Sequence, residues 1–424
     1  MASLDKEYRF WLVLLFISSF FGYGCYIINR KSFSFSMAAM SKDLGLEKDH
    51  LGTILSSFFM LYAFSKLFVG FLTDLLGSPR LLFALGLAIS AVINILFGLS
   101  SSMWAFSLLW MINGLIQGFG WPPVGKLLRV WVPSESFGRW WSTVSMGINV
   151  SAALSSIVFA ATTKALGWRF VFFGAGAVGL GMSVVIFLIT RDSPESVGLK
   201  SITSERSNSS AEKKRFSLRD VLSDWFLWVL SGNYLLFYVV KTSIADWSQM
   251  YLIQYREFPA SFAAYAIGML EVGGIVGSLV AGFSSDFIVS KMPRLGVFAR
   301  LPVICILIVI LELFLYVLNH TAFITEQYQI DAVFFMLGLA LYGPIAIWGV
   351  LAVENAPKGF EGTAHSVASM ASQTGAFLSG YPFSLLVSSY GWYWSFVTLE
   401  VTGLIVVVLF GFVFFYKLQK LKAD

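Results

Sequence analysis

Charged residues are scarce in this sequence of 424 residues. Asp, Glu, Lys and Arg together make up 12% of the chain, about half the fraction of an average soluble domain. Hydrophobic residues make up 57%. Apolar runs that approach or exceed the roughly 20 residues needed to cross a bilayer recur along nearly the whole length; examples are 10–28, 81–99, 170–189, 301–318 and 396–415. A dozen such runs exclude a soluble protein and predict an all-α, multi-pass membrane protein.

Cysteine and histidine are also scarce. Cys25 and Cys305 are the two cysteines, and both lie inside apolar runs. They offer neither a disulfide framework nor a cysteine-based metal site. The rival class, an intramembrane enzyme, needs a nucleophile, a paired-histidine metal site or a carboxylate dyad, and three scattered histidines supply none. We therefore expect no catalytic residues, no metal and no cofactor.

The apolar runs predict twelve transmembrane helices in two matched halves. A polar stretch, 191–222, carries the run Glu212-Lys213-Lys214-Arg215 and is typical of a flexible connector. It separates an expected six-helix bundle at 1–190 from a second at 223–424. The expected spans are 9–29, 51–75, 81–100, 104–128, 141–163, 169–190, 223–253, 262–285, 301–318, 331–353, 363–388 and 393–416.

The distribution of basic residues predicts the orientation. Of the 29 Lys and Arg residues, nearly three times as many fall on the side of both termini as on the other side, and basic residues concentrate in cytoplasmic loops. Both termini are therefore expected in the cytosol. The formal net charge of +5 then reflects topology and contact with membrane lipid, and we expect no nucleic-acid partner. Asn319-His320-Thr321 is a glycosylation triplet in an expected non-cytosolic loop, whereas the triplet at Asn208 is expected to stay bare.

A short motif recurs in both halves. Gly70 and Asp74 precede Arg80 in the first half, and Gly282 and Asp286 lie 212 residues further along. We expect the glycines to let neighbouring helices approach closely, and the aspartates to pair with a basic loop or cap a facing helix. This arrangement resembles the major facilitator superfamily. The resemblance implies two bundles that rock about a site near the bilayer midplane.

Three cations within or at the end of the expected spans predict an anion site. A charge inside a span costs about 2.5–3.5 kcal/mol on insertion scales. Lys66 and Lys241 lie within expected spans, and Arg30 lies at the inner end of the first one. Arg30 and Lys241 lie 211 residues apart, at nearly equivalent places in the two halves. Phosphate suits this pair, because arginine offers a planar fork and lysine a point charge. The alternatives are that Arg30 reaches interfacial water, that Lys66 is neutralised by Glu271, and that Lys241 pairs with Asp246.

Two further charged residues have structural interpretations. Lys31 is expected to extend its ammonium group to the water interface. Glu312 lies in the span 301–318, where we expect it to have a structural partner.

Several segments resemble the organophosphate:phosphate antiporters: 29–35, 65–66, 118–123, 241–248 and 342–344. Within that family, 114–129, 271–278 and 342–357 are similar to animal members of the endoplasmic reticulum. The resemblance implies exchange of glucose 6-phosphate for inorganic phosphate, with phosphate held by Arg30 and with Lys66 and Lys241 lining the same cavity. It also implies coupling to a luminal glucose-6-phosphatase, and so a place in glycogen metabolism. Bacterial glycerol-phosphate members have arginine in place of Lys241 and histidine in place of Ile148, so a two-arginine clamp and a histidine proton step are not expected.

Aromatic and amide side chains are candidates for contact with a sugar. Pro122 and Pro123 are expected to kink the span 104–128. Aromatic residues at helical spacing also serve as ordinary packing, and a cytosolic loop is the alternative position for the histidine. The candidates are Tyr23, Tyr26, Tyr62, Trp121, Asn149, Tyr234, Tyr238, Tyr342 and His365.

Other functions and a location remain as hypotheses. A non-transporting sensor on the same fold, or a carrier of glycerol phosphate or a phosphoenolpyruvate-like anion, fits the same features. Lys420 and Lys422 stand fifth and third from the end of the sequence, a spacing similar to dilysine retrieval signals of the endoplasmic reticulum. A basic anchor at the membrane surface is the alternative interpretation.

Overall fold

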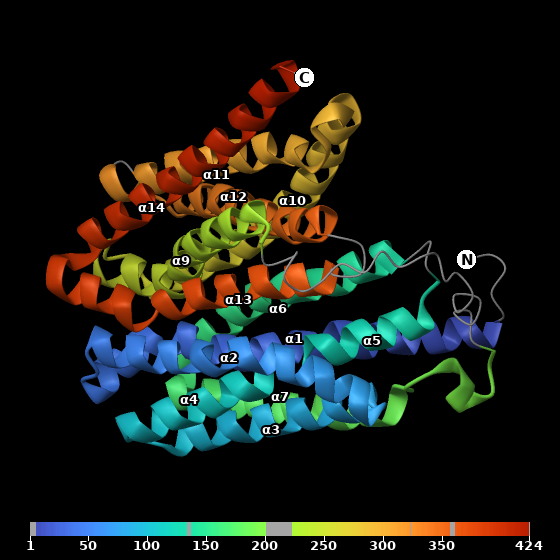
Figure 1. Cartoon of the computed structure of the whole chain (residues 1–424). Helices are drawn as coiled ribbons and strands as arrows, with labels where there is room; N and C mark the ends of the chain where they lie inside the picture. Colours follow the sequence, from blue (N-terminus) through green and yellow to red (C-terminus); the bar gives the residue numbers. More distant parts are fainter. Residues whose placement is uncertain (1–5, 134–136, 201–222, 323, 357–360, 424) are drawn as a thin grey trace. The chain divides into compact units, whose positions relative to one another are not determined.

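The computed structural model describes residues 6–133, 137–200, 223–322, 324–356 and 361–423, which are almost entirely helical (Figure 1). Within these ranges the side chains of Lys66 and Asp74 are not described. The first helices are α1 (Lys6–Leu44), α2 (Lys48–Leu76), α3 (Pro79–Leu99), α4 (Met103–Gln117), α5 (Trp121–Trp131), α6 (Phe137–Leu166) and α7 (Trp168–Ile189). A short 3-10 helix, η1 (Pro194–Val197), follows.

The second series begins after residue 222. It comprises α9 (Trp225–Gln254), α10 (Ala260–Lys291), the 3-10 segment η3 (Pro293–Arg300), α11 (Leu301–His320), α12 (Gln327–Asn355), α13 (Glu361–Leu378) and α14 (Tyr381–Ala423). Gly391, with φ of 79°, breaks the helical backbone within α14. This break separates the two last expected spans.

Every expected span falls on a helix. In the described part of the chain, nine segments are long and apolar enough to cross a membrane, the last of them running from α13 through α14. The other expected spans correspond to α4 with α5 and to α9. A membrane-spanning backbone must satisfy its own hydrogen bonds, which helices do. The prediction of an all-α, multi-pass membrane protein is confirmed.

Two local predictions meet different outcomes. Residues 118–120 interrupt the helix before Pro122 and Pro123, so the expected break in span 104–128 is confirmed. The expected end of the first span near residue 29 is wrong, because α1 continues for about four turns beyond Arg30. No glycine or proline occurs from 31 to 44, and the helix ends at Gly45, whose φ is +64°.

The chain forms two compact units, which are described separately. One unit contains residues 1–40 and 57–213, and the other contains residues 41–56 and 214–424. The start of α2, as far as Ser56, thus groups with the second unit. There Ser56 Oγ lies 2.8 Å from the Phe377 carbonyl oxygen and accepts a hydrogen bond from the Tyr381 amide at 2.7 Å.

Glycines allow close helix contacts, but not at the expected positions. A Cβ atom on Gly338 of α12 would lie 1.8 Å from the Leu270 carbonyl oxygen of α10, and one on Gly277 would lie 2.1 Å from the Leu339 carbonyl oxygen. By contrast, a Cβ on Gly70 or Gly282 would meet nothing within 4 Å in the described structure. Among the described residues of each unit, these two motif glycines therefore make no close contact with a neighbouring helix.

Candidate functional site

Arg30 lies in the middle of α1, where it is partly exposed. Buried polar groups on either side of it attach α1 to its neighbours. Ser32 Oγ lies 2.8 Å from Asn94 Oδ1 of α3, and Gln117 of α4 donates its amide to the Tyr26 carbonyl oxygen at 3.1 Å. Unpaired polar groups in such an interior are costly, so these contacts fix the position of the helix that carries the guanidinium. The sequence analysis did not single out the roles of Ser32, Asn94 and Gln117. Each is a polar residue within an apolar span, and this could have identified it.

Lys31 does not reach a water interface as expected. Its side chain is buried, at 6% exposure, and its Nζ lies 5.8 Å from the centre of the Phe35 ring. The expectation is wrong because α1 continues past this residue, which places Lys31 inside the helical bundle. Lys66 belongs to α2, and the orientation of its side chain lies outside the described structure.

The aromatic candidates of the first half divide into two groups. Tyr23 lies against Trp121, with ring centres 4.9 Å apart, and Trp121 meets Trp141 at 4.7 Å. Tyr26 is fully buried and donates its hydroxyl group to the Phe83 carbonyl oxygen at 2.9 Å. Tyr26 therefore holds α1 against α3 and is not free to meet a sugar, so this candidate is withdrawn.

Two further candidates of this half are buried. Tyr62 is 5% exposed and packs on Phe58, with ring centres 5.5 Å apart. Asn149, on α6, is 8% exposed. Tyr62 therefore contributes to packing in this structure, as aromatic residues at helical spacing commonly do.

Lys241 lies over two tyrosine rings. Its Nζ is 5.5 Å from the ring centre of Tyr238, one turn earlier on α9, and 5.4 Å from that of Tyr342 on α12. Tyr342 donates its hydroxyl group to Glu271 Oε1 at 2.9 Å. An aromatic face attracts a cation without neutralising its charge. Rings from α9 and α12 thus position the ammonium group, and Glu271 of α10 holds one of these rings in place.

A second aromatic cluster supports this arrangement. Tyr234 stacks on Trp348 at 5.1 Å and meets Tyr238 edge-on at 4.9 Å. Trp348 is fully buried and donates its indole N–H to the Leu230 carbonyl oxygen at 3.3 Å. The sequence analysis did not single out Trp348. His365 is an exposed residue of α13, so it lies on a helix and not in the loop that was its alternative position.

The second copy of the repeated motif forms an ion network. Arg300 lies 2.6 Å from Asp286 and makes two hydrogen bonds to Glu354, at 2.8 and 2.9 Å. The expected pairing of Asp286 with a basic residue of the following loop is confirmed. In the first half the side chain of Asp74 is not described, and the Arg80 amide donates to Asp192 at 2.8 Å.

Two residues of α11 differ from their expected roles. Glu312 is buried, and neither of its carboxyl oxygens has a hydrogen-bond partner among the described residues, so the expected structural partner is absent there. Asn319 is buried within the end of the helix and donates its amide to Glu400 at 3.1 Å. A buried, hydrogen-bonded amide nitrogen is unsuited to carry a glycan, which contradicts the glycosylation expectation for Asn319. Asn208 lies outside the described residues.

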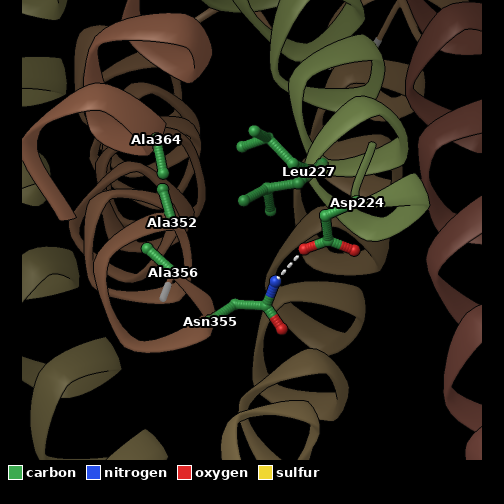
Figure 2. A pocket seen from close by; sticks show the side chains of 7 residues that line it. Asp224, Leu227, Ala352, Asn355, Ala356 and Ala364 are labelled. Carbon is green, nitrogen blue, oxygen red and sulfur yellow. Dashed lines mark hydrogen bonds between the residues drawn. The ribbon is translucent and has the colours of Figure 1, made fainter. Parts of the chain in front are cut away.

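A small cleft of about 220 Å³ lies where α9 begins and α12 ends, beside α13. Figure 2 shows Asp224 accepting a hydrogen bond from Asn355 at its edge. Leu227 and three alanines contribute apolar lining. Its lining residues include a carboxylate and no cation, so this cleft is unsuited to phosphate.

Comparison with known proteins finds relatives that align with nearly the whole of this chain. The model of the Major Facilitator Superfamily matches residues 19–380. A probable hexose phosphate transport protein of Chlamydia trachomatis is 34% identical, covering 96% of this chain and 92% of that protein. The membrane sensor protein UhpC of Salmonella typhimurium is 30% identical over 92% of this chain and 88% of its own. A glycerol-3-phosphate transporter of Bacillus subtilis is 29% identical, with 86% and 83% covered.

A solved structure agrees with the fold. A bacterial homologue of the human lysosomal transporter Spinster matches with a TM-score of 0.79 at 17% identity, covering 99% of both chains. The chain therefore belongs to the Major Facilitator Superfamily and, within it, to the organophosphate:phosphate antiporter family.

Proposed function

We propose that this chain exchanges glucose 6-phosphate for inorganic phosphate by alternating access, and that Arg30 and Lys241 both bind the phosphoryl group. The observation that supports this most strongly is the environment of Lys241. Its ammonium group lies over Tyr238 and Tyr342, and Tyr342 is anchored to Glu271. This arrangement holds a charged group in place inside a membrane protein, where a retained charge usually serves a function.

The charge of the two residues explains exchange. An empty binding site that contains cations within the membrane has an electrostatic cost, and a phosphate dianion relieves it. An empty carrier then switches poorly, whereas a carrier loaded with either anion switches readily, so return of phosphate resets the carrier. Lys66 is the third proposed phosphate ligand. The halves 1–190 and 223–424 are the proposed moving bundles, joined by the connector 191–222.

The sugar part of the substrate requires amphipathic contacts. Four aromatic residues offer rings for these contacts, and Asn149 offers an amide. The four are Tyr23, Trp121, Tyr238 and Tyr342. Rings of this kind present both an apolar face and a polar edge or hydroxyl group. The names of the Chlamydia and Bacillus relatives refer to hexose phosphate and glycerol 3-phosphate, which supports a phosphate ester as the substrate class.

A counterflow experiment tests the proposal. Proteoliposomes are loaded with inorganic phosphate and exposed to labelled glucose 6-phosphate, glycerol 3-phosphate or phosphoenolpyruvate. We expect uptake of glucose 6-phosphate that depends on internal phosphate. Preferential uptake of another ester changes the assigned substrate but preserves the antiporter. Liposomes that bind but do not exchange any of these anions contradict the transport proposal.

A sensor is the second candidate function. The 30% identity to the membrane sensor protein UhpC favours it, because a sensor can retain the phosphate-binding residues of a carrier. Saturable binding of glucose 6-phosphate without counterflow supports a sensor, whereas phosphate-dependent uptake excludes a purely sensory role.

The proposed location is the endoplasmic reticulum membrane, with both termini in the cytosol. Carriage of glucose 6-phosphate inward would supply a luminal glucose-6-phosphatase, and the returning anion would be the phosphate that the phosphatase releases. In sealed microsomes, hydrolysis of external glucose 6-phosphate should then depend on this chain. Hydrolysis at the parental rate in microsomes that lack the chain contradicts the coupling.

A further inference from the structure

Titratable side chains gather along the contact between α11 and α14, away from the residues assigned to phosphate. Glu312 and His320 belong to α11, and Tyr393 and Glu400 belong to α14. The two helices pack directly against each other. Neither the proposed substrate site nor the Arg300 network uses these groups.

Glu312 lies in an unusual position for a carboxyl group. It is 8% exposed, and both oxygens lack a hydrogen-bond partner among the described residues. A Cβ atom on Gly403 of α14 would lie 1.7 Å from Glu312 Oε1. The carboxyl group therefore occupies the space that the missing side chain of Gly403 leaves open.

Glu400 has the opposite environment. Its Oε2 lies 2.9 Å from His320 Nε2, and its Oε1 accepts a hydrogen bond from the Asn319 amide at 3.1 Å. The Tyr393 hydroxyl group lies 3.1 Å from His320 Nδ1. The His320 side chain is about a fifth exposed, so this cluster extends from Glu400 to the protein surface.

The charged groups on neighbouring helices have partners of their own. Just after α9, Arg256 donates to the carbonyl oxygens of Leu318 and Ile324, and Tyr251 of α9 donates to Leu318. On α10 and α12, the partners are Glu271 with Tyr342, Asp331 with Gln327, and Arg300 of η3 with Asp286 and Glu354. The carboxyl group nearest along α14 to the Glu312 contact is Glu400, one turn before Gly403.

We propose that Glu312 is a proton-binding site, and that His320 and Glu400 conduct the proton to it from the surface. An ionised carboxylate at this position would be a buried charge without a counter-ion, beside a second carboxylate, and such burial is costly. Glu400 has two hydrogen-bond donors to stabilise its charge, whereas Glu312 has none among the described residues. One proton on this pair therefore resides on Glu312. A proton moves from water to the imidazole and then to a Glu400 oxygen. No hydrogen bond joins Glu400 to Glu312 among the described residues, so the last transfer follows a side-chain rotation that brings the two carboxyl groups together, and no other bond changes.

The bound proton has a consequence for stability. The folded chain retains a proton on Glu312, whereas an unfolded chain exposes the carboxyl group to water, where it is ionised at neutral pH. When the folded state binds more protons than the unfolded state, stability falls as the pH rises. Ionisation of Glu312 places a second negative charge in the contact between α11 and α14, and this loosens the two helices.

Infrared difference spectroscopy on the purified full chain tests the site, with Glu312→Gln as the variant. The amide has nearly the same shape and carries no titratable proton. We expect a carbonyl band of a protonated carboxylic acid at neutral pH in the parent, and loss of that band in Glu312→Gln. Glu47→Gln removes an exposed carboxylate and serves as the matched control that keeps the band. The melting temperature of Glu312→Gln should also fall less steeply with rising pH than that of the parent.

The relay is tested with His320→Gln, which leaves Glu312 in place. Here the acid band should persist but exchange its proton for deuterium several-fold more slowly after transfer to heavy water. Persistence of the full band in Glu312→Gln, or its absence from the parent, overturns the proton site. Deuterium exchange as fast as in the parent overturns the relay through His320. If Glu312→Gln cannot be purified, absence of the acid band from both the parent and His320→Gln still contradicts the proposal. None of these measurements depends on transport, so they remain informative if the proposed substrate is wrong.

Discussion

The ammonium group of Lys241 lies over two aromatic faces, which attract a cation without neutralising its charge. Cation–π contacts with Tyr238 and Tyr342 contribute about 0.5–2 kcal/mol each. A phosphate oxygen offers a charge-assisted hydrogen bond of about 1.5–3 kcal/mol. The lysine is thus held in place by the rings and gains further stabilisation from an anion.

The first prediction concerns Lys241→Ala. Loss of one charged hydrogen bond of about 1.5–3 kcal/mol should weaken phosphate binding about 10- to 100-fold. Lys241→Arg keeps the charge and is the matched control. Competition binding with labelled phosphate in detergent measures the affinities. Parental affinity in Lys241→Ala, at normal abundance, contradicts a role in phosphate binding.

The second prediction concerns Arg30→Lys. The substitution keeps the positive charge but removes the planar fork that binds two phosphate oxygens at once. We expect counterflow to fall about tenfold, the equivalent of one hydrogen bond of about 1.4 kcal/mol, with normal folding. Gel filtration and counterflow of the same preparation separate the two effects. Unchanged exchange in this variant would remove Arg30 from the site.

Tyr342→Phe tests the support of Lys241. The variant retains the ring under the ammonium group but loses the hydroxyl group that donates to Glu271. Loss of a hydrogen bond to a charged group should lower stability by about 1.5–3 kcal/mol, while phosphate affinity changes less than in Lys241→Ala. Thermal unfolding and phosphate binding on one sample measure both. A larger loss of affinity than in Lys241→Ala would assign the hydroxyl group itself to the ligand.

The contact between α10 and α12 depends on the absence of side chains. Gly338 and Gly277 each lie against a backbone carbonyl oxygen of the facing helix, and close approach through small residues is how membrane helices associate. Gly282, on the same α10, faces open space. One helix therefore offers both a tightly packed and a tolerant glycine position.

We expect Gly338→Ala to be destabilising and Gly282→Ala to be tolerated. A methyl group at 338 would press on the Leu270 carbonyl oxygen, and backbone cannot move aside cheaply, so a loss of about 1–3 kcal/mol follows. At 282 the alanine should gain about 0.5–1 kcal/mol through its helix propensity. The melting temperature and the monodisperse yield in detergent report both effects. Equal melting temperatures for the two variants would show that the contact is looser than described.

At the scale of the whole molecule, the basic residues on the side of the two termini concern the protein's location in the cell as well as its orientation in the membrane. Lys420 is an exposed residue near the end of α14, while the side chain of Lys422 is not described. We predict that replacing both with serine moves the protein from the endoplasmic reticulum to later compartments, as seen by microscopy of the tagged chain. Replacing Lys6 and Arg9 removes the same charge from the same expected side and should leave the location unchanged. An unchanged distribution after the Lys420 and Lys422 substitutions would support a basic membrane anchor instead.

Hydropathy and short motifs determined the class of this protein. The apolar runs predicted the helices because a chain in lipid must satisfy its backbone hydrogen bonds within each span. The interruption before Pro122 and the pairing of Asp286 were also predictable, because proline and charge act locally. The single sequence indicated Lys241 as a candidate, since a cation within an apolar run is costly wherever the helix faces.

Tertiary structure decided which side of each helix meets which neighbour. Tyr26 looked like Tyr23 in the sequence, but its hydroxyl group is committed to the Phe83 carbonyl oxygen. Gly282 looked like a contact residue, yet Gly338 makes the close approach. Glu312 was expected to have a partner, and its position opposite Gly403 became apparent only once α11 and α14 were placed together. Hydropathy indicates that a segment lies in the membrane. Which neighbours each of its residues meets depends on helix rotation and packing, which no local pattern encodes.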